Sequence, residues 1–329
     1  MLDIKSVELR SEKEIMSTWA SKDKIIVSVL CATYNHESYI GDAITGFLMQ
    51  VTDFAFEIII HDDASVDETA TIIKKYQKEY PSIIKPIFQS DNQYSQGNKP
   101  GLIMHGVTQG KYYALCEGDD YWLDPNKLQI QYDYLETHEN IILCGHNSTV
   151  INEVNELIYP DRWLHKGHKD LMTPCLMYHK PNYTPVFIKY YSKIKNGDMA
   201  LRYFLSLHGD MDFLDFIGSA YRVHDGGIWS KKSHEERVLM SNHSFQLLFE
   251  WVIEENRHKL IPEILKRKMQ KQFLLMFIYL RKFQVVSGLN TFKILVCQIF
   301  NNKVKINILT KLYWILIALK RALLSKVTY

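Results

Sequence analysis

The sequence predicts an α/β fold with a mainly parallel sheet flanked by helices, followed by a C-terminal helical region. Two features carry this prediction. Between residues 24 and 137, short β-branched runs alternate with segments in which apolar residues recur at helical spacing. That alternation is typical of βαβ units, whose strands lie parallel. From residue 234 onward, the apolar spacing is almost entirely helical.

Four apolar runs are expected as strands, and a helix is expected after each. The strands would cover 25–32, 56–60, 83–88 and 112–116, and the first three helices 37–50, 68–80 and 102–108. The fourth helix is expected to begin at Asp124-Pro125, because aspartate caps helices and proline suits the first helical position. Asn35 is expected to cap the first helix, and Ser65 or Asp67 the second.

Composition limits the class of protein. The chain has 329 residues, 47% of them hydrophobic, which suits about two structural units of roughly 150 residues each. Its five cysteines are far apart, which argues against a disulfide framework or a zinc ribbon and for a reducing compartment. The first residues lack the apolar core of a signal peptide, and no uncharged apolar run approaches the roughly 20 residues of a spanning helix. A cytoplasmic location is therefore expected.

Polar clusters follow three of the expected strands, at 33–37, 61–67 and 117–120. Ligands of parallel sheets bind beyond the carboxyl ends of the strands, so a ligand site is expected there. The sequence contains no G-x-G-x-x-G, no G-x-x-x-x-G-K-[ST], no serine nucleophile elbow and no H-E-x-x-H. A dehydrogenase, a P-loop NTPase, a serine hydrolase of that type and a zincin are therefore disfavoured.

The third cluster holds Glu117, Asp119 and Asp120 within four positions. Carboxylates this close repel one another, and a hard divalent cation such as Mg²⁺ would offset the repulsion. Gly118 would allow a ligand to approach the backbone closely. The alternative is a solvated acidic turn. Likewise, the acids at 62–67 either bind a base and ribose or only support the start of the next helix.

Three stretches resemble glycosyltransferase family 2 enzymes with the GT-A, Rossmann-like fold. They are VSVLCATYNHESYIGDAI, FEIIIHDDASVDET and GKYYALCEGDDYWLDPNKLQIQYDYLE, in the family's order within residues 24–137. The last stretch resembles bacterial enzymes that build capsule, O-antigen or related surface polysaccharides. Downstream, NGDMAL at 196–201 resembles the acceptor-side motif, and YRVHDGGIWS at 221–230 resembles a late Tyr-Arg-x-His stretch. This chain has Glu117 where the family often has aspartate.

The resemblance implies a role for each matching residue. Donor binding would involve Thr33, Tyr34, Asn35, Glu37, Asp62, Asp63, Glu117, Asp119 and Arg222, the last neutralising the leaving group. Asp119 and Asp120 would bind the divalent cation, Mn²⁺ or Mg²⁺, with His224 as a further ligand of the metal or diphosphate. Asp198 would be the general base, although Asn-Gly-Asp is also an ordinary turn sequence.

The implied function is a transfer of sugar from a nucleotide-sugar donor, most simply a UDP-sugar, to a glycan or polyprenyl-diphosphate-linked acceptor. One base opposite the leaving group would invert the anomeric configuration. Two alternatives remain open: a nucleotidyltransferase, and a non-catalytic sugar-nucleotide-binding protein. The first usually has a basic glycine-rich loop near its N-terminus, whereas residues 24–40 contain neither arginine nor glycine.

Three parts are expected along the chain. Residues 1–23 would form an N-terminal arm, and 24–232 the GT-A catalytic domain, with a nucleotide-sugar half (24–137) and an acceptor half (138–232). Residues 233–329 would form a basic helical region. From residue 257 to the end there are fifteen Lys and Arg and one acid, Glu263, while the rest has 24 basic and 36 acidic residues.

The basic region therefore indicates a polyanionic partner or an acidic protein surface. A helix expected over 307–326 has an apolar stripe flanked by lysines. Residues 307–329 would either contact an anionic membrane peripherally or pack on the catalytic body. Nucleic acid is not expected as a partner, because no recognised nucleic-acid-binding module is present.

Overall fold

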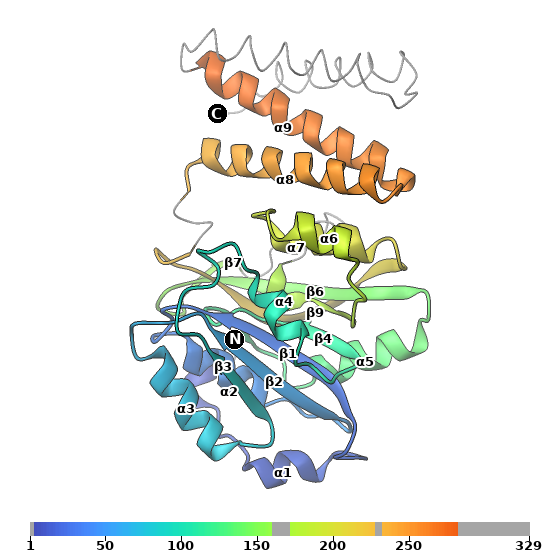
Figure 1. The fold of residues 1–329 in the computed structure, drawn as a ribbon. Coiled ribbons are helices and arrows are strands. Elements are labelled where there is room, and N and C mark those ends of the chain that lie inside the picture. Colours follow the sequence, from blue (N-terminus) through green and yellow to red (C-terminus); the bar gives the residue numbers. More distant parts are fainter. Residues whose placement is uncertain (1–2, 160–171, 228–231, 282–329) are drawn as a thin grey trace. The chain divides into compact units, whose positions relative to one another are not determined.

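The computed structural model describes residues 3–159, 172–227 and 232–281 (Figure 1). The chain divides into two compact units, each considered separately below. The first contains Met1–Asn182 and Leu201–Asp225, and the second contains Tyr183–Ala200 and Gly226–Tyr329. The second unit thus groups residues 183–200 with the later helices. A domain boundary at residue 232 stays a prediction.

The first unit is built on a nine-stranded sheet with the order β3-β2-β1-β4-β8-β6-β9-β5, and β7 pairs with β6. The first four strands along the chain lie parallel. They are β1 (Ile25–Thr33), β2 (Ala55–Asp62), β3 (Ile84–Phe88) and β4 (Tyr112–Leu115). This half of the sheet confirms the predicted α/β class.

The other half of the sheet is mixed. The short β8 (Met177–His179) pairs antiparallel with both β4 and β6 (Ile141–Asn152). The long β9 (Asp210–Val223) runs parallel to β6, and β5 (Tyr121–Trp122) pairs antiparallel with β9. The hairpin partner of β6 is β7 (Leu157–Tyr159). This pairing brings the end of β9 beside the segment that follows β4.

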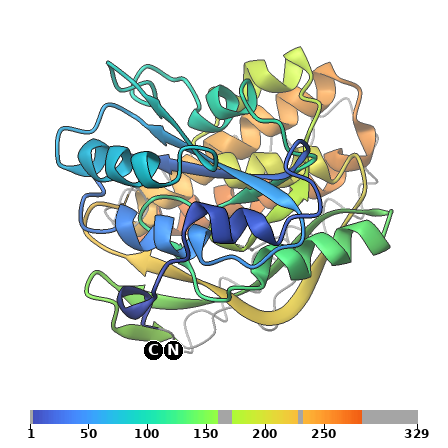
Figure 2. The same cartoon turned by 90° about the horizontal axis from the view of Figure 1, so that it is seen from below.

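Helices cover one face of the parallel strands, which is the face seen in Figure 2. They are α1 (Glu12–Ser17), α2 (Ile40–Leu48), α3 (Thr69–Glu79) and α5 (Lys127–Thr137). Their apolar sides join the buried strand residues in one core. Ile15 and Trp19, from the expected N-terminal arm, belong to this core. Among its described residues this unit also contains α4 (Pro100–His105), η1 (Ile4–Ser6) and η3 (Thr173–Cys175).

Three expected helix caps are wrong. The N-cap of α3 is Glu68 rather than Ser65 or Asp67, because both of those residues lie in the loop before the helix start. The N-cap of α2 is Tyr39, whereas Asn35 adopts a left-handed backbone with φ 54°. The reason is that the side chain of Asn35 bonds to a neighbouring loop instead of to α2. Likewise α5 begins at Lys127 rather than at Pro125. The carboxylate of Asp124 accepts a hydrogen bond from Asn126 N–H in the turn that precedes the helix.

The second unit is helical in its described part. It contains α6 (Pro185–Tyr191), the start of α7 (Gly197–Leu205), α8 (His234–Glu254), η4 (His258–Leu260) and α9 (Ile261–Arg281). Phe187 of α6 packs edge-on against Trp251 of α8 at 5.0 Å. Membrane crossing would need a longer or more apolar helix than any found in 3–159, 172–227 and 232–281. The expected helix at 307–326 and the membrane contact through 307–329 lie outside the described residues.

Candidate active site

The three polar clusters meet at the carboxyl ends of β1, β2 and β4. Thr33 lies beside Asp62 in the register of β1 and β2, and Asp63 N–H donates to Thr33 O at 3.0 Å. On the other side of β1, Gly118 N–H donates to Ala32 O at 2.9 Å. The loops after these strands therefore share one edge of the sheet, which is where ligands of parallel sheets bind.

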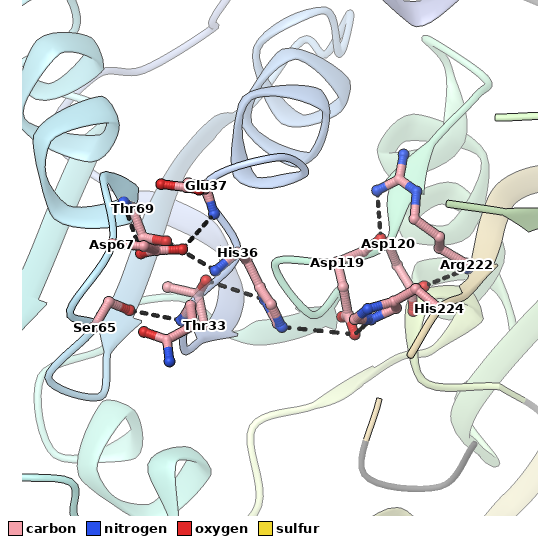
Figure 3. Close-up of polar contacts among 11 residues, drawn as sticks. Thr33, His36, Glu37, Ser65, Asp67, Thr69, Asp119, Asp120, Arg222 and His224 are labelled. Carbon is pink, nitrogen blue, oxygen red and sulfur yellow. Dashed lines mark hydrogen bonds and ion pairs between the residues drawn. The ribbon is translucent and has the colours of Figure 1, made fainter. Parts of the chain in front are cut away.

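Two of these loops are bonded to each other through their side chains (Figure 3). Asn35 Oδ1 accepts from Val66 N–H at 2.9 Å, and Glu37 Oε2 accepts from Glu68 N–H at 2.9 Å. In return, Asp67 Oδ2 accepts from Glu37 N–H at 3.0 Å. The predicted donor residues Asn35 and Glu37 therefore act in this structure by fixing one loop on the other. Their contact with a nucleotide stays a prediction.

The remaining predicted nucleotide residues lie at the same edge. Tyr34 is 43% exposed, whereas Asp62 and Asp63 are buried. The carboxylate of Asp62 accepts from Ser65 N–H, and that of Asp63 accepts from the N–H groups of Gln93 and Tyr94. The two aspartates thus order the loops that follow β2 and β3. Their binding to a base or ribose stays a prediction.

The acidic loop contains a buried carboxylate with an unused oxygen. Asp120 is 1% exposed, and its Oδ1 accepts from Arg222 N–H at 2.8 Å. Its Oδ2 has no hydrogen-bond partner within the described part of the chain. Burial, followed by the negative charges of Asp119 and Glu117, raises the pKa of Asp120 well above its usual range. A cation bound here would satisfy the oxygen and favour the ionised carboxylate.

Asp119 differs from Asp120 because two histidines face it. His224 Nε2 lies 3.0 Å from Asp119 Oδ2, and His36 Nε2 lies 3.8 Å from the same oxygen. Burial alone would raise the pKa of Asp119, but the hydrogen bond to His224 and the charge of His36 lower it overall. Burial lowers the pKa of His36, which favours a neutral imidazole. The structure therefore brings the predicted Asp119 and His224 together.

His36 was not predicted as a site residue. It lies between the predicted residues Asn35 and Glu37, and its place three positions after Thr33, the last residue of β1, was the available signal. Candidate metal-ligating atoms of His36, Asp119 and His224 all lie within 4.8 Å of one another. The same holds for Glu117, Asp119 and Asp120. These two groups share Asp119 and fit a divalent cation, because carboxylate and imidazole are common ligands of such ions.

Arg222 lies behind the acidic loop with its side chain fully buried. Its guanidinium donates to Asp119 O at 2.6 Å, to Asp42 Oδ2 at 2.8 Å and to Asn155 Oδ1 at 2.6 Å. It also stacks 4.6 Å from the ring centre of Tyr39. Protein groups surround the guanidinium. Its contact with a leaving group stays a prediction.

Two partners of Arg222 had no usable sequence signal. Asp42 lies in the first turn of α2, where an acid is ordinary. Asn155 lies in the turn between β6 and β7 with φ 66°. Their side chains bond to Arg222 only in the folded chain, where α2, the β6–β7 turn and β9 meet around the guanidinium. In this structure Arg222 thus joins β9 to the acidic loop, to α2 and to the β6–β7 turn.

Asp198, the predicted base, lies in the first turn of α7 and belongs to the second unit. The residues before it are held by that unit, since Asn196 Oδ1 accepts from Ser244 Oγ of α8 at 2.9 Å. Tyr191 lies close behind Gly197. The catalytic role of Asp198 stays a prediction.

Two solved structures share this architecture. Staphylococcus aureus TarS 1–349 in complex with UDP-GlcNAc aligns with 81% of this chain and 90% of its own, at a TM-score of 0.51 and 15% identity. The mannosyltransferase PcManGT from Pyrobaculum calidifontis, in complex with GDP-Man and Mn²⁺, aligns with 82% and 74%, at 0.52 and 9%. At these identities the likeness shows the fold alone. It is the GT-A fold of nucleotide-sugar-dependent glycosyltransferases.

The chain belongs to glycosyl transferase family 2, whose model matches residues 28–194. This confirms the resemblance found in the sequence. An uncharacterized protein of Mycobacterium tuberculosis is 33% identical over 222 residues, covering 64% of this chain and 62% of the relative. The alignment thus spans somewhat under two thirds of that relative's length.

Proposed function

We propose that this chain is an inverting, metal-dependent glycosyltransferase acting in the synthesis of a bacterial surface polysaccharide. The acidic loop in a family 2 domain carries the proposal. Glu117, Asp119 and Asp120 gather at the carboxyl edge of the sheet, and the buried Oδ2 of Asp120 is left without a hydrogen bond among the described residues. A buried carboxylate oxygen is normally paired with a hydrogen-bond donor or a cation. The polysaccharide pathway rests on the resemblance of residues 110–136.

The proposed donor is a nucleoside diphosphate sugar, with a UDP-sugar as the first choice. The two similar structures were solved with UDP-GlcNAc and with GDP-Man, so this class of donor suits the fold. In this chain the loops after β1 and β2 offer the exposed ring of Tyr34 and the exposed side chain of Val66. The buried acids Asp62 and Asp63 lie at the same edge. The proposed acceptor is a glycan or a polyprenyl-diphosphate-linked glycan.

The chemistry needs charge stabilisation on the leaving group and a base for the acceptor hydroxyl. A divalent cation, Mn²⁺ or Mg²⁺, would supply the first by neutralising the leaving diphosphate. Asp119 and Asp120 would hold it, with Glu117 directed to the ribose or the metal. Asp198 would take the proton of the acceptor hydroxyl. Attack on the face opposite the leaving group inverts the anomeric carbon.

The donor site is tested by thermal unfolding with UDP or GDP, with and without Mn²⁺. A ligand that binds only the folded state stabilises it by about 2.7 kcal/mol at 100 times its Kd. We expect a metal-dependent rise in Tm that Asp120→Asn abolishes and Asp133→Asn, an exposed change on α5, retains. Equal metal-independent binding in wild type and Asp120→Asn would contradict the proposal.

The reaction is tested with Asp198→Asn and by product analysis. We expect the variant to lose transfer by roughly 10²–10⁴-fold while keeping donor affinity, because the base acts on the acceptor. An equal loss of donor affinity would place Asp198 in the nucleotide site instead. Release of pyrophosphate rather than a nucleoside diphosphate would indicate a nucleotidyltransferase, and binding without either product would indicate a non-catalytic protein.

We also propose a peripheral location on the cytoplasmic face of the plasma membrane. The support is the excess of Lys and Arg over acids after residue 257, together with the apolar stripe expected over 307–326. A basic amphipathic helix lies in the membrane interface and gains about 1 kcal/mol for each Lys or Arg near anionic lipid.

A further inference from the structure

We propose that His36 is a metal-binding residue and that His36, Asp119 and His224 form a two-histidine, one-carboxylate site. This site would make the centre prefer a transition-metal cation to Mg²⁺. The inference rests on the proposed function, because the cation would act at the same nucleotide-sugar site. It goes further by naming a ligand that the acidic motif does not contain and by setting the choice of ion.

Two imidazoles converge on one carboxylate oxygen. His224 Nε2 lies 3.0 Å from Asp119 Oδ2, and His36 Nε2 lies 3.8 Å from it (Figure 3). The longer distance exceeds that of a hydrogen bond. Ligands at about 2.1 Å from a shared cation are separated by roughly 3 Å at neighbouring positions and roughly 4.2 Å at opposite ones. Both observed separations fall in that interval.

The protein also holds the His36 ring from the side opposite Asp119. Thr33 Oγ1 lies 3.2 Å from His36 Nδ1, which leaves Nε2 as the nitrogen that faces Asp119. The backbone of the same residue is also fixed, since His36 N–H donates to Thr69 Oγ1 at 2.8 Å. A partner on the second ring nitrogen is typical of metal-binding histidines, because it sets the tautomer and the ring orientation.

His224, the other nitrogen donor, is also held in place. Its ring lies edge-on to Tyr39 at 4.8 Å and to His36 at 6.0 Å. Its side chain is only 4% exposed, and it follows directly on β9, whose last residue Val223 pairs with Asn152 of β6. The three ligands therefore come from three separate segments, each anchored by bonds outside the site.

The donor set determines the choice of ion. Mg²⁺ prefers oxygen ligands in an octahedral arrangement, whereas imidazole nitrogen suits later first-row metals. Affinity for such sites rises from Mn²⁺ to Co²⁺. Two nitrogens beside Asp119 should therefore favour Mn²⁺ and, more strongly, Co²⁺ over Mg²⁺. Glu117 and Asp120 supply the oxygen donors that all three ions accept.

The test measures dissociation constants of Co²⁺ and Mg²⁺ on the full chain, with UDP present, by calorimetry and by the visible absorption of bound Co²⁺. Wild type is compared with His36→Gln and His224→Gln. His138→Gln is the control, because His138 is exposed at the end of α5. We expect wild type to bind Co²⁺ at least tenfold more tightly than Mg²⁺. His36→Gln should weaken Co²⁺ at least tenfold, change its absorption and leave Mg²⁺ within about twofold.

The outcomes separate this inference from the proposed function. If wild type binds Mg²⁺ and Co²⁺ with UDP equally well, and His36→Gln changes neither, the histidine site is wrong and the glycosyltransferase proposal stands. If wild type shows no metal-dependent UDP or GDP binding at all, the proposed function fails as well. Retained Mg²⁺ affinity in His36→Gln shows that the variant is folded.

If His36→Gln binds neither Co²⁺ nor Mg²⁺, a second variant, Thr33→Val, provides the test, because it removes only the partner of His36 Nδ1. Weaker Co²⁺ with unchanged Mg²⁺ in Thr33→Val supports the site, and two unchanged constants overturn it.

Discussion

At the scale of single residues, Gly118 shows how tightly the acidic loop is packed. A Cβ at this position would lie 2.6 Å from Thr33 Oγ1, 2.7 Å from Thr33 Cβ and 3.1 Å from His36 Nδ1. Gly118 was expected to let a ligand approach the backbone closely. In the structure the side chain of Thr33 occupies this space. The loop can carry three acids beside His36 only because this position has no side chain.

Gly118→Ala should therefore disturb both packing and binding. We expect a loss of about 1–3 kcal/mol in the free energy of unfolding, because the new methyl group must displace Thr33. Cation-dependent binding of UDP should weaken as His36 moves. Gly41→Ala is the matched control, since its Cβ would meet nothing within 4 Å and α2 should gain roughly 0.5–1 kcal/mol. Denaturant unfolding of both variants measures the effect, and equal stabilities would refute this account of Gly118.

Lys127 is a second residue whose setting is unusual. Its side chain is fully buried, its Nζ donates to Gln131 Oε1 at 2.7 Å, and the ammonium lies 4.1 Å from the ring centre of Trp122. Burial lowers its pKa to about 8. The charged form is therefore less favourable in the folded state than in the unfolded chain.

The pH dependence of stability follows from this shift. Below pH 8 both states hold the proton, and the folded state carries the full cost of the buried charge, about 3 kcal/mol. Between pH 8 and about 10.5 the unfolded state binds more protons, so folding becomes more favourable as pH rises. Lys127→Met should remove this rise, whereas Lys85→Met, at an exposed position, should retain it. Melting curves from pH 7 to 10 provide the measurement, and parallel profiles for all three proteins would contradict it.

At the scale of elements, Arg222 joins parts of the first unit that are far apart in the sequence. Its bonds link β9 to the acidic loop, to α2 through Asp42, and to the β6–β7 turn through Asn155. Arg222 and Asp42 form a largely buried ion pair. Removal of either side chain therefore leaves the charge of the other uncompensated. The acidic loop therefore depends on packing that lies entirely outside the motif.

Arg222→Lys tests this link. A lysine keeps the charge but has one ammonium in place of the planar fork, so it cannot satisfy three partners at once. We expect a loss of about 3–5 kcal/mol in unfolding free energy and weaker metal-dependent UDP binding. Arg267→Lys is the control, because that arginine makes a partly exposed i,i+4 ion pair with Glu263 on α9, and such helix pairs contribute about 0.3–0.5 kcal/mol. A stability change no larger than that of the control would contradict this link.

At the scale of the whole molecule, the predicted site residues and the basic C-terminal region occupy different parts of the chain. All predicted site residues precede residue 225, whereas fifteen of the 39 Lys and Arg lie from residue 257 onward. The chemistry and the proposed membrane contact should therefore be separable. Electrostatic attraction to lipid is screened over about 10 Å at 0.1 M salt.

Deletion of residues 307–329 should release the protein from anionic vesicles and leave UDP binding unchanged. Sedimentation with vesicles, neutral or anionic, measures the first effect, and thermal shift measures the second. Binding of the full chain to anionic lipid should also weaken as salt rises. If the truncated chain sediments as before but melts many degrees lower, the segment is part of the core and the membrane proposal fails.

Much of the site was predictable because its residues lie in short motifs at the ends of strands. Thr33 and Asp62 are the last residues of β1 and β2, Asp119 follows β4, and the carboxyl ends of neighbouring parallel strands must meet at one edge of the sheet. The caps Asn35 and Asp124 were mispredicted for a related reason. Each side chain bonds to a nearby loop or turn segment instead of to the helix start, and local spacing does not distinguish these alternatives.

The sequence by itself determined the α/β class, the acidic motif and the membership of glycosyl transferase family 2, because periodicity and motifs are properties of short segments. Tertiary structure alone placed His36 beside Asp119 and surrounded Arg222 with its partners. His36 and His224 converge on Asp119 from loops 188 positions apart, and Arg222 supports it through Asp42, 180 positions away. Such contacts depend on how α2, β4 and β9 pack together, and no local pattern records that packing.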